Sequence, residues 1–189
     1  MNLIIDFFKN LTWQRVLIDL LGYTAILCSV LSFQQKTQRR IAILQGTSNL
    51  FWMTHMFLLS ALAGGLLNLV GLLRGILFSL REKHAWARKK IWYFVLLSLI
   101  AGVTVFSWIS GDGPKALLPA VAMVITTFSL SLEDPAKVRL LSSLSSPPWI
   151  VYSVFAGSIP SIVAELLNLG SILIGILRLD RKKKDEEGE

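Results

Sequence analysis

The chain has 189 residues, of which 53% are hydrophobic and 16% are charged. This composition is typical of a membrane protein and excludes an ordinary soluble domain. The formal net charge of +7 does not indicate a nucleic-acid partner, because the basic residues lie in short segments between apolar runs. The single cysteine, Cys28, cannot form an intrachain disulfide.

The first fifteen residues differ from the apolar runs that follow. Their hydrophobic residues recur at a helical spacing, and Trp13 and Arg15 follow them, residue types common at the headgroup boundary. The pattern predicts an interfacial segment over residues 1–15 that leads into the first span. The alternative is a frayed tail. We find no basic leader with a small-residue cleavage site, so we expect the first span to stay in the mature protein.

Seven apolar segments follow, each close to the ~20 residues that a spanning helix needs. In hydrocarbon every backbone polar group is satisfied within its own helix, so breaks belong between the spans. Polar, glycine and proline clusters supply those breaks, including a predicted glycine turn at residues 63–65. The sequence therefore predicts an all-α membrane protein with seven transmembrane helices over residues 17–33, 41–60, 63–80, 91–109, 115–132, 138–156 and 158–177.

The basic residues are distributed unequally between the two ends of these segments. Fifteen Lys and Arg residues fall in one set of connections and the C-terminal tail, whereas the other set holds only Lys9, Arg15 and Lys115. The positive-inside rule then predicts an N-terminus outside and a C-terminus in the cytoplasm. Residues 179–189 are expected to form a charged cytoplasmic tail that contacts water and lipid headgroups.

The chain also contains an internal repeat. Residues 66–81 and 166–181 agree at nine of sixteen positions, which pairs Asn68 with Asn168. Placing Trp52 on Trp149 extends the match backward without a gap. The distance from tryptophan to asparagine is unequal, however: sixteen residues in the first copy and nineteen in the second.

The repeat predicts a domain organisation. Residues 16–81 and 115–178 are expected to form two three-helix repeats, joined by a basic loop and a linker helix over residues 82–114. Because the linker adds one crossing, both repeats run in the same direction, a 3+1+3 layout of parallel repeats. In such architectures the substrate site lies near the midplane, between the repeats.

Polar and aromatic side chains mark one face of the second helix in each repeat. Segment 41–60 aligns Gln45 with three further residues at helical spacing, and segment 138–156 repeats the stripe from Ser142 onward. These stripes either bond helix to helix or face a cavity. An aromatic ring beside an amide suits a small polar ligand. The candidate substrate-binding residues are Asn49, Trp52, His55, Asn68, Arg74, Trp149, Tyr152 and Asn168.

Three ionisable residues inside the spans have two interpretations each. Arg74 either reaches toward the cytoplasmic interface or binds an anion, which would favour a carboxylate over a neutral sugar. Glu165 is a proton-coupling candidate, or it lies at a wet outer end of its span. His55 either titrates in a pocket or is a hydrogen-bonded structural histidine.

The whole chain resembles the YgjV-type bacterial inner-membrane proteins, and its repeat is similar to SemiSWEET, SWEET and other PQ-loop transporters. In those families the second helix of each bundle carries Trp-x-x-Tyr and the third carries an asparagine. Trp149 to Tyr152 matches this motif, and Trp52 to His55 matches it with His in place of Tyr. The Pro-Gln motif of the first helix is absent at both equivalent positions, which read Phe33-Gln34 and Leu130-Ser131.

The resemblance implies a location in the bacterial inner membrane and transport of a small polar solute. It further implies that the tryptophans and the third-helix asparagines meet in one midplane cavity. The third helix of each repeat should then lie between the first and the second.

The resulting hypothesis is a SWEET-like transporter or facilitator of a sugar or small carboxylate. The alternative is a non-transporting membrane scaffold or ligand receptor that retains the fold. No enzyme signature, metal site or cofactor motif is found, so the expected partners are membrane lipid and the solute. The oligomeric state is left open.

Overall fold

A computed structural model describes residues 13–180 of the chain, and all regular structure in that range is helical. Most of the predicted interfacial segment 1–15 and most of the charged tail lie outside the described residues. The long helices are α2 (Trp13–Phe33), α3 (Gln38–Leu58), α4 (Leu62–Ser79), α5 (Ile91–Ser107), α6 (Leu117–Ser129), α7 (Pro135–Ser143), α8 (Ser146–Phe155) and α9 (Ile159–Gly175).

Short helical pieces complete the chain: η1 (Ala85–Arg88), η2 (Trp108–Asp112), η3 (Gly113–Ala116) and η4 (Ile176–Asp180). The all-helical class is confirmed. Within the described part, four segments are long and apolar enough to cross a membrane, and the third of them contains both α5 and α6. They are Val16–Phe33, Leu62–Ser79, Ile91–Ser129 and Ile159–Arg178.

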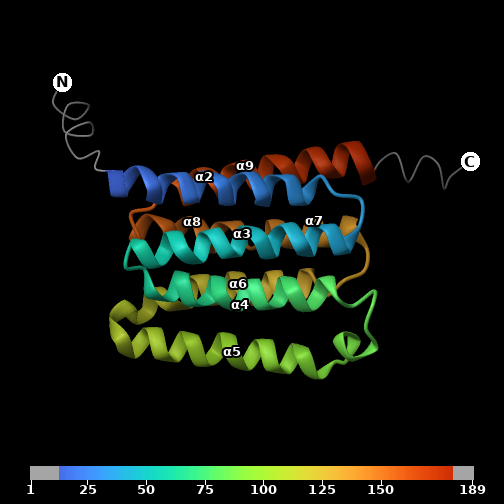
Figure 1. Ribbon diagram of the computed structural model, residues 1–189, viewed down its shortest axis with the longest axis horizontal. Coiled ribbons are helices and arrows are strands. Elements are labelled where there is room, and N and C mark those ends of the chain that lie inside the picture. Colours follow the sequence, from blue (N-terminus) through green and yellow to red (C-terminus); the bar gives the residue numbers. More distant parts are fainter. Residues whose placement is uncertain (1–12, 181–189) are drawn as a thin grey trace, which may run out of the picture.

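The helices form two layers (Figure 1). Helices α2, α3 and α4 lie side by side in one layer, and α9, the α7–α8 pair and α6 form the other. Across the layers α2 packs on α9 and α4 packs on α6, while α5 covers the edge beside α4 and α6. The first helix of each repeat therefore contacts the third helix of the other.

The predicted helix order within a repeat is wrong. Helix α3 lies between α2 and α4, and the α7–α8 pair lies between α6 and α9, so the second helix is central in both repeats. The physical reason is the length of the connections. Only residues 34–37 join α2 to α3, and only residues 59–61 join α3 to α4. Such short hairpins keep consecutive helices adjacent.

The sixth predicted span is two helices rather than one. Helix α7 ends at Ser143, residues 144–145 form a turn, and α8 begins at Ser146. Pro147 and Pro148 occupy the first turn of α8. Proline has no N–H to donate, and its ring clashes with the carbonyl four residues earlier, so the helix cannot run through this point.

The predicted glycine turn at residues 63–65 is also wrong. The turn consists of residues 59–61, where Ser60 adopts a left-handed φ of 58°. Gly64 and Gly65 lie inside α4. They are small for packing reasons: a Cβ at Gly64 would lie 2.9 Å from Cε1 of Tyr152, and one at Gly65 would lie 2.4 Å from Phe57. The corresponding turn between α8 and α9 has Gly157 at a left-handed φ of 63°.

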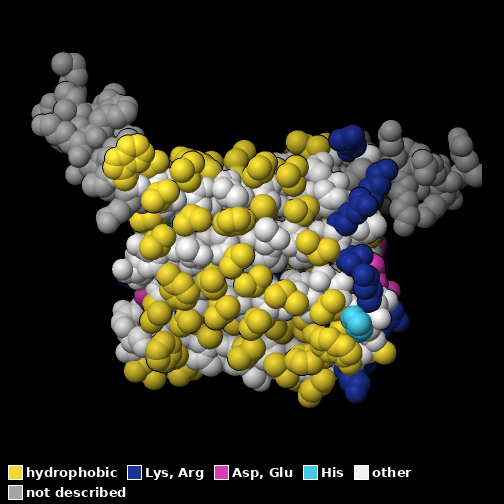
Figure 2. Space-filling model, in the orientation of Figure 1, with side chains coloured by type: hydrophobic (Ala, Val, Ile, Leu, Met, Phe, Trp, Pro, Cys, Tyr) yellow, Lys and Arg dark blue, Asp and Glu magenta, His cyan; other side chains and the backbone are white. Residues whose placement is uncertain are grey.

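The face of the molecule shown in Figure 2 has a broad apolar zone and a basic end. Hydrophobic side chains cover the sides of the helices, as expected where lipid is the solvent. Lys and Arg side chains gather at the end of the bundle where α2 joins α3 and α4 leads toward α5. This is the end that the loop count assigns to the cytoplasm.

Candidate solute-binding site between the two repeats

The two repeats share one constant register, which fixes the equivalence of their residues. Helix α3 ends at Leu58 and α8 ends 97 positions later at Phe155; α4 and α9 begin with the same separation. The left-handed turn residues, Ser60 and Gly157, also lie 97 positions apart. No residue is inserted in the turn of the second repeat.

This register corrects the sequence alignment of the third helices. At a constant separation of 97, the equivalent of Asn68 is Glu165, and the equivalent of Asn168 is Gly71. The sequence match had slid α9 by three residues against α4. Three residues are nearly one helical turn, so both alignments keep the same face toward the cavity. In a leucine-rich segment, only the length of the turn distinguishes them.

Hydrogen bonds and packing support the structural register. Gln45 Nε2 donates to Ser32 Oγ at 2.7 Å, and the equivalent pair, Ser142 and Ser129, has its Oγ atoms 2.7 Å apart. Closer to the turn between α8 and α9, Ser153 of α8 and Ser161 of α9 are hydrogen-bonded at 2.6 Å. Their equivalents also meet, since a Cβ at Gly64 would lie 3.3 Å from Met56.

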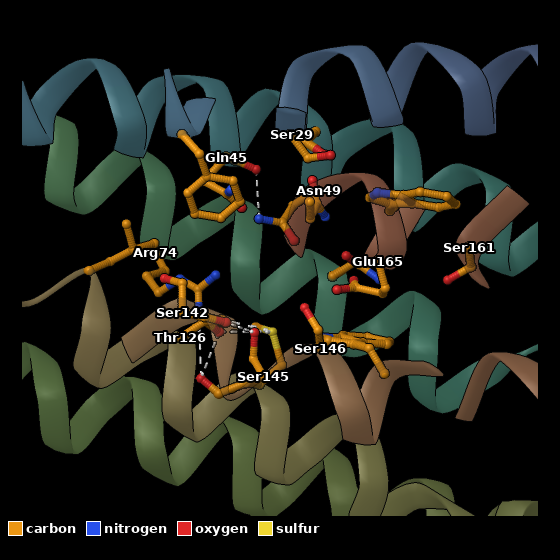
Figure 3. A pocket seen from close by; sticks show the side chains of 18 of the residues that line it. Ser29, Gln45, Asn49, Arg74, Thr126, Ser142, Ser145, Ser146, Ser161 and Glu165 are labelled. Carbon is orange, nitrogen blue, oxygen red and sulfur yellow. Dashed lines mark hydrogen bonds between the residues drawn. The ribbon is translucent and has the colours of Figure 1, made fainter. Parts of the chain in front are cut away.

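A central cavity lies between the two layers (Figure 3). It is lined by residues of α2, α3, α4, α6, α7, α8 and α9, and its volume is about 70 Å³. That volume accommodates a few water molecules, well below the ~300 Å³ of a drug-sized pocket. The predicted convergence is confirmed, because four residues that were expected to meet all line this cavity: Trp52, Asn68, Trp149 and Asn168.

The amides of the cavity wall are bonded mostly within their own helices. Asn49 Nδ2 donates to the carbonyl of Gln45 at 2.7 Å, and Asn68 Nδ2 donates to the carbonyl of Gly64 at 2.8 Å. Asn168 is different, because its buried Oδ1 has no hydrogen-bond partner. An unpaired acceptor in a buried wall is costly, so this atom is suited to a donor from a solute or water.

Arg74 is a cavity residue and does not reach toward the basic end. Its side chain is only 2% exposed and lies against α6. Nη1 donates to Thr126 Oγ1 at 2.7 Å and Thr127 Oγ1 at 3.1 Å, and Nε has no partner. The interpretation of Arg74 as an interfacial residue is therefore wrong. Its guanidinium is held in the bundle interior by neutral groups.

Glu165 occupies the opposite layer of the same cavity. Its carboxylate lies within hydrogen-bond reach of the side chains of Ser146 and Asn168, and Figure 3 shows Glu165 near Ser146. The residue is half-buried, and it lines the cavity. The structure therefore places this acid in the cavity wall, on α9 and facing the break between α7 and α8.

His55 and Tyr152 were predicted as binding residues, but neither lines the cavity. His55 is fully buried, with Nδ1 2.9 Å from the Ile18 carbonyl and Nε2 3.0 Å from Ser158 Oγ. Tyr152 Oη accepts the backbone N–H of Gly64 at 2.9 Å. Each side chain thus connects the second helix of one repeat to the start of the third helix of the other.

Both residues keep a common relation to their tryptophan. His55 meets Trp52 edge-on with ring centroids 5.2 Å apart, and Tyr152 meets Trp149 edge-on at 5.9 Å. Asp112 adds a second cap beside Tyr152, since its Oδ2 accepts the N–H of Ala63 at 2.8 Å. The fourth position of the motif therefore joins the repeats, while the tryptophan faces the cavity.

Further polar side chains, mostly hydroxyl groups, complete the cavity wall, although they were not among the predicted binding residues. For several of them a signal was present in the sequence, because Gln45 and Ser142 belong to the aligned polar stripes and Ser145 repeats Ser48. For Thr126 no pattern in the sequence was available. The additional polar lining residues are Ser29, Gln45, Ser48, Thr126, Ser142, Ser145, Ser146 and Ser161. Within the described range, no group of three His, Cys, Asp or Glu residues could hold a metal.

Comparison with known proteins agrees with this membrane architecture. Residues 16–183 match the Imp-YgjV family, described as "Bacterial inner membrane protein". The chain is 24% identical over 167 residues to "Inner membrane protein YgjV" of Escherichia coli (strain K12), covering 87% of this chain and 86% of that protein. No solved structure gives a significant match. Because the family match covers most of its length, the chain belongs to the Imp-YgjV family of bacterial inner membrane proteins.

Proposed function

We propose that the protein carries a small polar solute across the bacterial inner membrane through its central cavity. The observation that supports this most directly is the cavity itself, with Trp52 and Trp149 from equivalent positions in its wall. Polar side chains inside a membrane bundle are costly unless they serve a ligand, an ion or another helix. The proposal adopts from the SWEET-type transporters the parallel repeats, the linker helix and the tryptophans, but not their order of helices.

The break between α7 and α8 supports a moving wall. Broken helices in transporters place free backbone groups and a bendable point at the substrate site. Here the break lies at Leu144 and Ser145, and Ser145 and Ser146 line the cavity. The first-helix prolines of the SWEET-type motif are absent, and Pro147-Pro148 in the second repeat supplies a different place to bend. A cavity of about 70 Å³ then represents the closed state.

The transport proposal is tested with purified protein in proteoliposomes. We expect flux of at least one member of a panel of sugars, short carboxylates and amino acids above protein-free vesicles. The double variant Trp52→Ala/Trp149→Ala should reduce it about tenfold or more, because both walls of the binding site are lost. Trp108→Ala is the matched control, since Trp108 is 45% exposed in η2. Equal flux in all three proteins would contradict the proposal.

We further propose that the N-terminus lies outside and the C-terminus in the cytoplasm. The gathering of Lys and Arg at one end of the bundle supports this orientation. A green fluorescent protein fused after Glu189 should fluoresce, whereas alkaline phosphatase fused there should be inactive. The reverse pattern would overturn the orientation.

A ligand receptor or scaffold is the second candidate, and the small cavity volume favours it. A receptor binds its solute without passing it on. Binding detected by a thermal shift, combined with no flux in proteoliposomes, would identify this class.

A further inference from the structure

The cavity wall contains two charged residues, one from each repeat: Arg74 of α4 and Glu165 of α9. Neither forms an ion pair with another described side chain. In the register of 97 residues, Arg74 corresponds to Ser171 and Glu165 corresponds to Asn68. Each charged residue therefore has a neutral equivalent: Asn68 lines the cavity, whereas Ser171 is hydrogen-bonded to α2 through the Val30 carbonyl.

The two charges lie at different depths in the bundle. Glu165 is at the level of Asn68, and Arg74 is six residues further along the equivalent helix, which is about 9 Å at 1.5 Å per residue. Figure 3 shows this separation: Arg74 lies beside Thr126 and Ser142, and Glu165 lies beyond them, beside Ser146. Neutral groups occupy the interval between the charges, including the unpaired Oδ1 of Asn168.

The surroundings of each charge explain what they can bind. Arg74 is buried with its Nε unpaired, and its hydrogen-bond partners are hydroxyl, carbonyl and thioether groups. A guanidinium in this state favours a carboxylate, which it can bind with two parallel hydrogen bonds. Glu165 and the free oxygen of Asn168 offer acceptors, which favour an ammonium group.

A solute that carries one charge leaves the other cavity charge uncompensated. A simple carboxylate would pair with Arg74 and lie in the field of Glu165, and a neutral sugar would pair with neither. In an α-amino acid the two charged groups are attached to the same carbon, so it reaches one partner only. A linear molecule with its charges at opposite ends reaches both.

We propose that the solute is a short linear zwitterion, an ω-amino acid whose carboxylate binds Arg74 and whose ammonium group binds Glu165 and Asn168. The cavity wall follows α3 from Gln45 to Met56, about 16 Å of helix, which is long enough to include the interval between the two charges. This inference rests on the proposed transport function and defines its substrate class.

The test uses the full chain in proteoliposomes with radiolabelled solutes of increasing charge separation. The series is glycine, β-alanine, γ-aminobutyrate and δ-aminovalerate, with valerate, n-amylamine and glucose as solutes that lack one or both charges. We expect flux to rise about tenfold or more from glycine to the longer members, and the longer members to exceed all three controls. Flux that favours glucose, valerate or glycine overturns the zwitterion inference and leaves transport standing. No flux of any solute overturns both.

Charge variants give a readout that a structural role would not produce. Glu165→Gln should raise the flux of valerate relative to γ-aminobutyrate, and Arg74→Gln should raise that of n-amylamine, because each removes one repulsive charge. Glu82→Gln and Arg178→Gln are the matched exposed controls. Arg74→Lys is the second variant, to be used if Arg74→Gln does not fold. Because it keeps the positive charge, we expect it to keep the order of solute preference of the unmodified protein. An equal loss for every solute in the folded variants would contradict the inference.

Discussion

The two repeats have the same frame and different cavity walls. In both, a 2.7 Å hydrogen bond at equivalent positions joins the first and second helices. In both, a tryptophan on the second helix packs edge-on against the ring three residues later, and that ring contacts the start of the third helix of the other repeat. The walls differ because α3 is continuous, whereas its equivalent is broken between α7 and α8. The frame contacts are thus repeated, and the differences are concentrated where a solute would bind.

One pair of equivalent positions differs in its residues but keeps the packing between the second and third helices. In the first repeat the amide of Asn49 on α3 covers Gly71 of α4, where a Cβ would lie 2.6 Å from Oδ1. In the second repeat the small residue is Ser146 on α8 and the amide is Asn168 on α9. The large and the small residue have changed helices, so the volume is similar while the amide enters from the other side.

The largest expected loss of stability comes from replacing a glycine at a tight helix contact of the first repeat by the residue at the equivalent position of the second repeat. Gly75 approaches Gly46 so closely that a Cβ would lie 2.5 Å from its Cα, whereas the equivalent position in α9 is Ile172. We expect Gly75→Ile to lower the free energy of unfolding by about 3 kcal/mol or more, because backbone atoms would have to separate. Denaturant unfolding in detergent micelles measures this.

Gly170→Ala is the control for that variant, because a Cβ there has no neighbour within 4 Å. We expect it to be neutral or slightly stabilising, since alanine is the better helix former. Similar losses in both variants would show that the close approach of α3 and α4 is not the cause.

A smaller effect is expected for the side chains that join the repeats. Tyr152→Phe removes the acceptor of the Gly64 N–H at the start of α4, a donor with no partner within its own helix. The cost should be about 1–3 kcal/mol in thermal or denaturant unfolding. Solute preference in proteoliposomes should not change, because Tyr152 does not line the cavity. A changed solute preference in a variant of normal stability would show that Tyr152 takes part in solute binding.

The smallest effect tests whether the repeated hydrogen bonds are energetically equivalent. Ser32→Ala removes one side-chain bond between the first and second helices, whereas Ser129→Ala removes two, because Ser129 Oγ also lies 2.7 Å from the Val138 carbonyl. At about 0.6 kcal/mol for each bond, the usual size in membrane bundles, we expect the loss in the second repeat to be about twice that in the first. Thermal unfolding of the two variants side by side measures the difference. A loss in only one repeat would show that the matching geometry does not carry matching energy.

Much of this fold is encoded in local patterns. The seven predicted segments agree with the observed helices within a few residues, except at the broken sixth segment. The proline pair that causes the break was present in the sequence, within a segment that was predicted as one continuous span. His55 and Tyr152 were misplaced because helical spacing defines a face of the helix but does not say which part of that face reaches the cavity.

The sequence by itself determined the membrane class, the helix positions, the duplication and the tryptophans of the cavity, because apolar length and periodicity act within each segment. Only the tertiary structure decided the helix order and the pairing of Asn68 with Glu165 instead of Asn168. It also decided that Arg74 lies inside the bundle. The physical reason is that a slide of one helical turn leaves the apolar pattern almost unchanged, while turn length and interhelical packing allow only one register.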